Sequence, residues 1–165
     1  MRIKSTMWLV AVTLMFAFCV TASTVYADSF SDAEKLANQG DAKAQYELGM
    51  CYEYGDSTIN LAKDEAKAVE WYEKSANQGY SKAQYQLAGL YDRGTGVAQD
   101  HAKAVFWLEK AADQGNAGAL YALGIRYQAG SDGVSEDQEK GCALLKAAGD
   151  KGHKRALDIY NESCK

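Results

Sequence analysis

The chain repeats one pattern of alanine, leucine, tyrosine and glycine. Residues 44–49 read AQYELG, residues 83–88 read AQYQLA and residues 119–124 read ALYALG. The glycines that close the copies, Gly40, Gly79, Gly115 and Gly152, lie 39, 36 and 37 residues apart. A period of this length is typical of stacked helical units, each of which is too small to bury its apolar face alone. The sequence therefore predicts an extended array of repeats rather than a single globular core.

Two helices fit into each copy. Apolar and small residues recur every three or four positions, as at Ala44, Leu48 and Tyr52, which is the period of an α-helix with one buried face. We expect a first helix, A, at 42–54, 81–92 and 117–129, and a second helix, B, at 64–77, 100–113 and 137–149. Residues 31–39 match the end of a B helix, and residues 153–163 match an A helix. The whole chain lacks proline, which suits an all-α fold.

An aspartate stands just before each predicted B helix, at Asp64, Asp100 and Asp137. A carboxylate at this place accepts hydrogen bonds from the free backbone N–H groups of the first turn. We therefore interpret these aspartates as helix caps rather than as catalytic acids.

The first residues do not belong to the array. Arg2 and Lys4 precede an apolar run over residues 7–20, and Val25 and Ala27 are small residues of the kind that precede a cleavage site. We predict a signal peptide over 1–27 and a mature domain over 28–165, with no membrane insertion after cleavage. The formal net charge of −4 becomes more negative when the signal is removed, which argues against nucleic acid as a partner.

Three cysteines lie in the predicted mature chain, and an exported protein meets an oxidising compartment. Cys142 takes the place of a valine found in the earlier B helices, and Cys164 takes the place of a tyrosine found in the A helices. Both places face inward on neighbouring antiparallel helices. We predict a Cys142–Cys164 disulfide, which leaves Cys51 over.

The motifs A-x-x-x-L-G-x-x-Y, G-x-G-V, D-x-x-K-A-x-x-W and the closing Q-G resemble the Sel-1-like repeat, a relative of the tetratricopeptide repeat, over about residues 31–164. The resemblance implies a right-handed α-solenoid of about three helix-turn-helix repeats, at about 42–79, 81–115 and 117–152, with a C-terminal helix at 153–164 and half-repeat caps. It implies that A helices line a concave face and B helices the outside. This sequence departs from the pattern at Ala88-Gly89, at Gly141 and at Leu144, which replaces tryptophan.

Tyr46, Tyr85 and Tyr121 occupy one place in three successive A helices. If the implied geometry holds, they form a ladder on or beside the concave face, and aromatic residues with a polar tip are favoured at protein interfaces. The alternative is that these tyrosines simply pack between helices. Neighbouring A-helix positions differ between copies and are where partner choice should be encoded: Lys43, Met50, Glu53 and Tyr54 in the first, Lys82, Asp92 and Arg93 in the second, and Ile125, Arg126 and Gln128 in the third.

No catalytic constellation stands out in the sequence. His101 and His153 have no second histidine or paired cysteine at metal-ligand spacing, so we predict no metal, no cofactor and no enzymatic activity. Members of the family that this chain resembles act as adaptors and binding scaffolds, and exported bacterial members are associated with envelope assembly, host contact and neutralisation of secreted toxins. The resemblance thus implies a periplasmic module that binds another protein through its concave face, and in its most concrete form an immunity protein that blocks a secreted antibacterial toxin. Two alternatives stay open: an envelope hydrolase of the β-lactamase or peptidoglycan type, whose cysteine-rich relatives carry a cysteine pair in every repeat, and a structural adaptor in an envelope complex.

Overall fold

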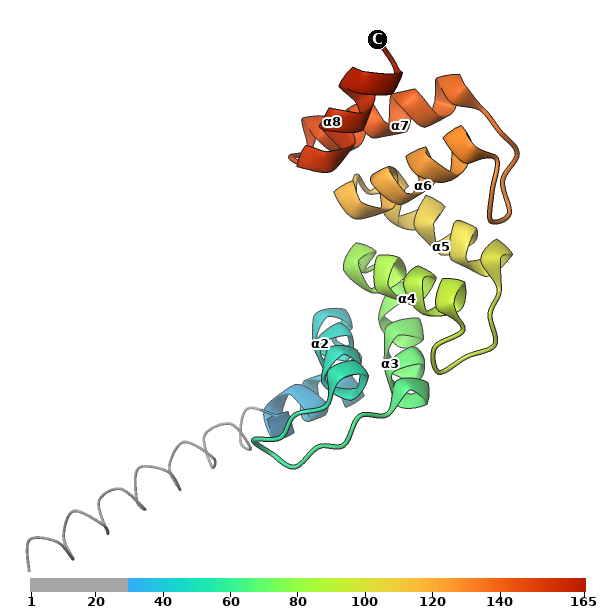
Figure 1. The fold of residues 1–165 in the computed structure, drawn as a ribbon. Coiled ribbons are helices and arrows are strands. Elements are labelled where there is room, and N and C mark those ends of the chain that lie inside the picture. Colours follow the sequence, from blue (N-terminus) through green and yellow to red (C-terminus); the bar gives the residue numbers. More distant parts are fainter. Residues whose placement is uncertain (1–29) are drawn as a thin grey trace, which may run out of the picture.

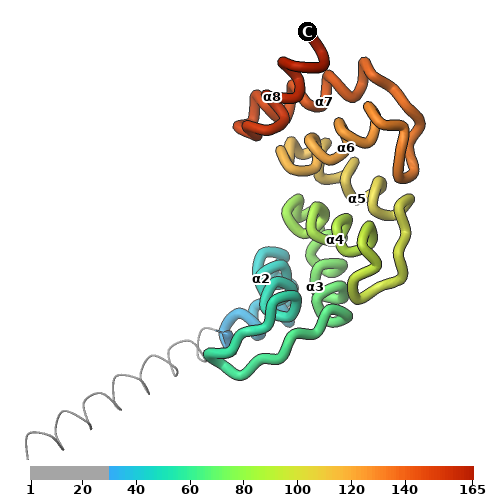
Figure 2. The backbone as a smooth tube through the Cα atoms, viewed as in Figure 1, coloured from blue at the N-terminus to red at the C-terminus, as the bar shows by residue number. Residues whose placement is uncertain are grey.

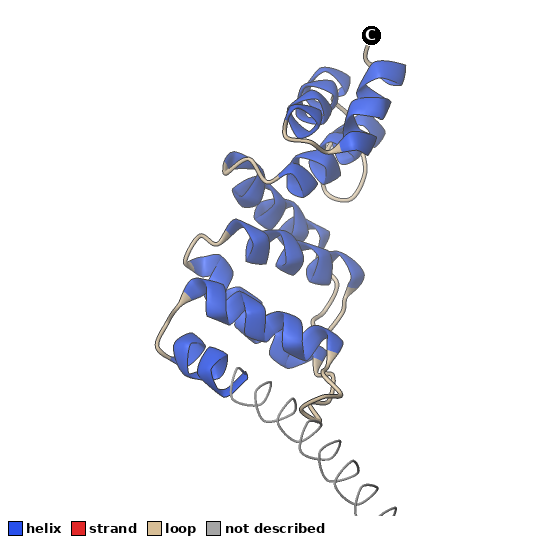
Figure 3. Ribbon diagram, turned by 90° about the vertical axis from the view of Figure 1, so that its left-hand side faces the viewer, coloured by secondary structure: helices blue, strands red, loops and turns tan. Residues whose placement is uncertain are grey.

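A computed structural model describes residues 30–165 of the chain, so the predicted signal peptide over 1–27 lies outside the described residues. Residues 30–38 are helical. They are followed by α2 (Ala42–Tyr54), α3 (Glu65–Asn77), α4 (Ser81–Arg93), α5 (His101–Asp113), α6 (Ala117–Ala129), α7 (Gln138–Asp150) and α8 (Lys154–Ser163). Figure 3 draws the described residues as helices and loops. The only β pairing among them is one isolated bridge, Asp56 to Leu61, within the long loop between α2 and α3.

The helices stack into an arc. In Figures 1 and 2, α2, α4, α6 and α8 follow the inner side of the arc and α3, α5 and α7 follow the outer side. The former are the predicted A helices and the latter the predicted B helices, and every helix begins and ends within one residue of its predicted bounds. The chain is therefore an all-α solenoid, as the sequence predicted.

The aspartates before the B helices are caps, as predicted. Asp64, Asp100 and Asp137 each accept a hydrogen bond from the backbone N–H three residues later, at 3.0, 2.9 and 2.9 Å. Each bond satisfies a donor that the helix itself leaves free, which is worth about 1 kcal/mol. The three carboxylates are used by the fold and need no catalytic explanation.

Small residues bring the A and B helices of a repeat close together. A Cβ added at Gly49 of α2 would lie 2.7 Å from the ring of Tyr72 on α3, and one added at Gly124 of α6 would lie 2.9 Å from Leu145 on α7. In the third repeat a Cβ added at Gly141 would also lie 3.0 Å from the Gly124 carbonyl oxygen. The departure at Gly141 therefore allows α6 and α7 to approach backbone to backbone.

Buried glutamines on α2 and α4 each form a hydrogen bond with the end of the preceding helix. Gln45 donates to the carbonyl of Ala37 at 3.0 Å, and Gln84 donates to the carbonyl of Ala76 at 3.1 Å. The closing glutamines Gln78 and Gln114 then donate to the side chains of Gln45 and Gln84. The third repeat has Leu120 at this place, so the glutamine chain ends there.

The predicted disulfide is confirmed. Cys142 of α7 is bonded to Cys164, which follows α8, with 5.7 Å between their Cα atoms. Cys51 is a half-buried free cysteine. The bridge fastens the segment just after α8 to α7 of the third repeat.

We predict that the double variant Cys142→Ser and Cys164→Ser folds but loses about 2–4 kcal/mol of free energy of unfolding, because the unfolded chain regains the freedom of a closed loop with a sequence separation of 22. Urea denaturation of oxidised protein measures the difference. Cys51→Ser is the control, and its expected change is within about 0.5 kcal/mol. Equal stability of the double variant and the wild type would contradict the role given to the bridge.

Candidate binding surface on the inner face

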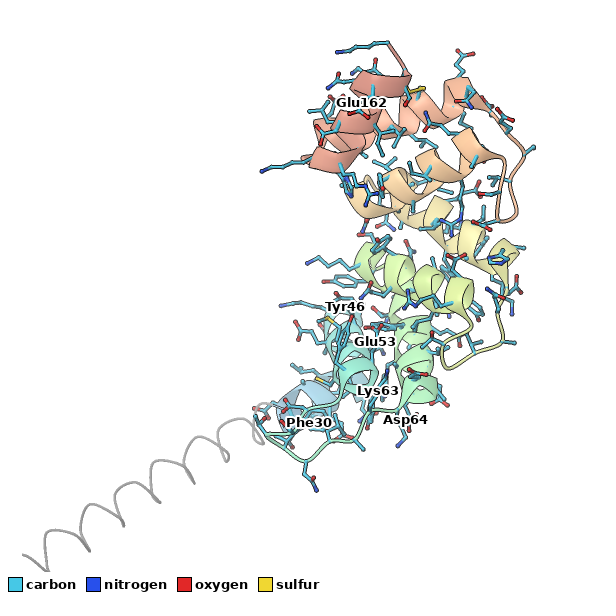
Figure 4. All side chains as sticks on the ribbon, in the orientation of Figure 1. Phe30, Tyr46, Glu53, Lys63, Asp64 and Glu162 are labelled. Atoms are coloured by element: carbon cyan, nitrogen blue, oxygen red, sulfur yellow. A yellow bond between two sulfur atoms is a disulfide. The ribbon has the colours of Figure 1, made fainter. Side chains whose placement is uncertain are left out.

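The tyrosine ladder runs along the A helices, and each ring covers the start of the next A helix. Tyr46 lies on the part of α2 that faces α4, with its ring centroid 5.3 Å from that of Tyr80 (Figure 4). The ring of Tyr85 lies over Gly118, where an added Cβ would be 2.9 Å from Tyr85 Cζ. Tyr121 stacks on His153 at 4.3 Å. The rings therefore pack between repeats and still keep an accessible edge, and Tyr85 is 37% exposed.

A second line of polar side chains also joins consecutive A helices. Glu53 accepts a hydrogen bond from the Tyr72 hydroxyl at 2.7 Å and lies 3.7 Å from the Arg93 guanidinium (Figure 4). One repeat later, Asp92 lies 2.7 Å from the Arg126 guanidinium. Glu53, Asp92 and Arg126 are thus engaged by their own chain, and Arg93, whose side chain is 59% exposed, is the group of this line that reaches the inner surface.

The third member of this line is Gln128. Its amide nitrogen lies 3.3 Å from the sulfur of Cys164 and 3.6 Å from that of Cys142. Gln128 therefore packs on the disulfide. The amide of Gln128 is thus engaged within the third repeat.

Burial and hydrogen bonding shift the pKa values along this line. Burial raises the pKa of Tyr72, and the hydrogen bond that its hydroxyl donates to Glu53 raises it further. Burial, with a hydrogen bond to Glu73, likewise raises the pKa of Tyr91 to about 12. Burial alone would raise the pKa of Asp92, but hydrogen bonds from His101 and Arg126 outweigh it and hold the pKa below its usual range. Asp92 is therefore a carboxylate at neutral pH, already paired within the chain.

A hollow of about 200 Å³ opens on the inner face between α4 and α6. Its lining consists of Tyr85, Gln86, Ala88, Gly89, Asp92, Arg93, Leu108, Ala122 and Arg126. Pockets for drug-sized ligands are usually about 300–1,000 Å³, so this one has room for about one side chain. The lining contains two guanidinium groups, and each lies near a carboxylate: Arg126 near Asp92 and Arg93 near Glu53.

The two arginines of the hollow have unused hydrogen-bonding capacity. The Arg93 side chain is 59% exposed, and its ion pair with Glu53 is long. Arg126 is mostly buried, and its Nε has no hydrogen-bond partner among residues 30–165. A buried donor without a partner costs free energy, but this Nε is not accessible from the surface, so the Arg93 guanidinium is the donor that the hollow offers to a ligand.

The other predicted site residues divide into exposed and packed side chains. Lys43 and Lys82 are exposed on the inner helices, although Lys43 is 3.4 Å from Glu47. Tyr54, at the end of α2, is 65% exposed. Met50 and Ile125 are half-buried and pack against the core clusters of their repeats. The structure thus brings Tyr85, Asp92, Arg93 and Arg126 together and leaves the rest of the predicted set spread along the arc.

The sequence reasoning missed the residues that make the hollow deep. Gly89 and Ala122 are small at places where the first repeat carries Met50 and Glu47, and Leu108 lies beneath them. The sequence did indicate this, because the glycine of the second copy, Gly89, stands one residue later than Gly49 and Gly124 in the other copies. Read as a loss of volume on the inner face, Gly89 would have indicated the position of the hollow.

The described residues hold no group of three or more histidine, cysteine or acidic side chains placed to bind a metal ion. None of their helices combines the length and the apolar character that crossing a membrane requires.

Comparisons with known proteins agree on one family. The sequence model of the Sel1 repeat matches residues 42–80, 81–116 and 117–153. A protective antigen present in uropathogenic Escherichia coli strains, displaying an SLR fold, is similar in structure, with a TM-score of 0.73 and 36% identity over 81% of this chain and 28% of that one. A Sel1 repeat protein from Oxalobacter formigenes has a TM-score of 0.73 and 30% identity over 81% of this chain and 98% of that one.

The cysteine rich protein B of Helicobacter pylori is a more distant match, with a TM-score of 0.60 and 24% identity over 79% of this chain and 96% of that one. At this identity the likeness shows the fold alone. No curated protein matches the chain significantly.

We predict that the stability of the protein falls above about pH 10 and that Tyr72→Phe makes this fall shallower. The pKa of Tyr72 is raised in the folded state, so its contribution is present below the unfolded-state value near 10 and is lost as the pH rises, by up to about 1.4 kcal/mol per pH unit. Urea denaturation at a series of pH values measures the slope. Tyr54→Phe, at an exposed tyrosine, is the control and should keep the wild-type slope; equal slopes for all three proteins would refute this assignment.

Proposed function

Because the chain belongs to the Sel1 repeat family, whose members generally mediate protein–protein interaction, we propose that it is a periplasmic binding module that receives its partner on the inner face of the solenoid. In the most concrete form of this proposal it is an immunity protein for a secreted antibacterial toxin.

The hollow between α4 and α6 is the observation that carries the proposal. It combines the half-exposed ring of Tyr85 and the exposed guanidinium of Arg93 over a floor that includes Leu108 and Ala122. Tyrosine and arginine are the residue types that most often dominate the energy of protein interfaces. An acidic side chain of the partner, or a backbone carbonyl, would supply an acceptor for the Arg93 guanidinium.

Export is supported by two observations. The Cys142–Cys164 disulfide is of a kind that persists in oxidising compartments such as the periplasm. The predicted signal peptide over residues 1–27 points to the same route. The similar structure from Escherichia coli is that of a protective antigen.

The immunity form rests on the association of exported family members with toxin neutralisation. A small arc with a hollow on its inner face suits a protein that blocks by binding. The described residues lack a metal-binding cluster, and their capping carboxylates are used by the fold.

We predict that Arg93→Glu weakens partner binding at least tenfold, because it reverses the charge at the rim of the hollow. Gly89→Met should do the same without a charge change, since methionine stands at this place in the first repeat and would fill the hollow. A Cβ at Gly89 meets only the flexible end of Arg93, so this variant is expected to fold. The mature chain first captures its partner from an envelope extract of the producing cell, and calorimetry then gives each affinity.

The matched control is Lys110→Glu on the outer helix α5, which makes the same charge change away from the hollow. It should bind like the wild type. Equal affinity of all four proteins for the captured partner, or an equal loss in the Lys110 variant, would contradict the inner-face site.

We predict that a strain lacking the gene is killed by its isogenic parent on contact, with survival at least tenfold lower than beside a parent whose toxin secretion is disabled. Colony counts after co-culture measure the survival. The full gene restores survival, and the Arg93→Glu gene does not. Equal survival beside both parents would contradict the immunity form, and a defect of the deletion strain grown alone would instead favour a structural role in the envelope.

A further inference from the structure

The B helices carry a large side chain at one repeated place on the outer face. It is Trp71 in the first repeat and Trp107 in the second. Trp71 packs against the cluster that contains Ala37, Leu48 and Tyr52. Trp107 packs against the cluster that contains the equivalent residues Ala76, Leu87 and Tyr91. Each indole therefore sits in a cradle made by the preceding B helix and the A helix of its own repeat.

The third repeat keeps the cradle but has a smaller residue in it. Leu144 stands where the tryptophans stand, and the equivalent cradle residues are Ala112, Leu123 and Tyr127. A second hollow of about 200 Å³ opens here, lined by Glu109, Ala112, Asp113, Leu123, Tyr127, Lys140 and Leu144. The hollow thus lies where the chain's own indole lies in the two preceding repeats.

The polar residues around this place are of the same types in the second and third repeats, but their hydrogen bonds differ. In the second repeat the hydroxyl of Tyr91 donates to Glu73 at 2.7 Å. In the third repeat Lys140 Nζ donates to the Tyr127 hydroxyl oxygen at 2.6 Å. Glu109 takes the place of Glu73 and is exposed, and Tyr127 does not donate to it; Lys140 is near enough to Glu109 for the two charges to attract each other. A carboxylate acceptor therefore stands at the edge of a side-chain-sized hollow.

We propose that this hollow binds a tryptophan side chain of a partner protein. The indole ring fills the place that Trp71 and Trp107 fill in their own repeats, against Leu123 and Leu144, and the indole N–H donates to the carboxylate of Glu109. An indole is flat and carries an N–H donor that the Glu109 carboxylate can accept, whereas phenylalanine brings no donor. The site lies on the outer face, between α5 and α7, and does not depend on the inner-face site.

The probe for a first experiment is N-acetyl-tryptophanamide, titrated into the mature protein while the methyl groups of Leu123 and Leu144 are followed by NMR. We expect saturable shifts at both residues. N-acetyl-leucinamide is the control ligand and should give at most a tenth of the affinity. Absence of a saturable shift at Leu123 up to the solubility limit of the tryptophan probe would overturn the proposal.

Variants separate this hollow from general apolar binding. Leu144→Trp restores the residue of the earlier repeats, so it should raise the midpoint of thermal unfolding and abolish the shift at Leu123. Leu144→Phe fills the hollow with a different ring and should also abolish the shift at Leu123. It provides the test if Leu144→Trp does not fold. Glu109→Gln should weaken the tryptophan probe severalfold and leave the leucine control unchanged. Binding of the probe to Leu144→Phe with wild-type affinity would overturn the proposal.

A second copy of the chain is the competing occupant, because Phe106 on α5 is 49% exposed on the same outer side. Shifts of the Leu123 methyls that grow with protein concentration, without probe, and vanish in Phe106→Ala would replace the tryptophan proposal with self-association. Concentration-independent spectra are the expected result.

Discussion

The close approach of paired helices is the constraint on which the rest of this structure depends. At Gly49 and Gly124 the A helix comes so near its B helix that an added Cβ would lie within 3 Å of Tyr72 or Leu145. Such contacts fix the position of one helix on the other, and protein interiors tolerate little change in volume at such places. Every equivalent position therefore faces the same neighbours in each repeat. A smaller residue in one copy leaves a hollow, because the neighbouring helices are held in place by the remaining contacts.

Both hollows have this origin. On the inner face, Gly89 and Ala122 stand where the first repeat has Met50 and Glu47. On the outer face, Leu144 stands where the first two repeats have tryptophan. The repeated residues determine how the helices pack. The surface features that distinguish this chain arise where one copy has a smaller side chain, or different hydrogen bonds, than the other copies.

The helices, their caps and the disulfide could be predicted because their signals are local or repeat along the chain. Asp64 caps α3 through a bond to a residue only three positions away, and Cys142 and Cys164 were placed by comparison with earlier copies. The hollows could not be predicted in the same way, because each depends on several helices at once. Arg126 illustrates this: it stands at a place where the second repeat has the buried Leu90, and only the packing of α6 on α4 brings it to Asp92.

The two hollows share the walls of α5 and α6. Leu108, Ala122 and Arg126 line the inner one, and the residues that follow each of them directly, Glu109, Leu123 and Tyr127, line the outer one. Successive helical residues point about 100° apart, so one turn of a helix serves both faces. The exposed Arg93 guanidinium gives the inner hollow a donor, whereas the outer hollow is bordered by the carboxylates of Glu109 and Asp113 beside Lys140. Substitutions at these neighbouring positions of α5 and α6 therefore act close to both surfaces, whereas Gly89 and Arg93 on α4 line the inner hollow alone and Leu144 on α7 lines the outer hollow alone.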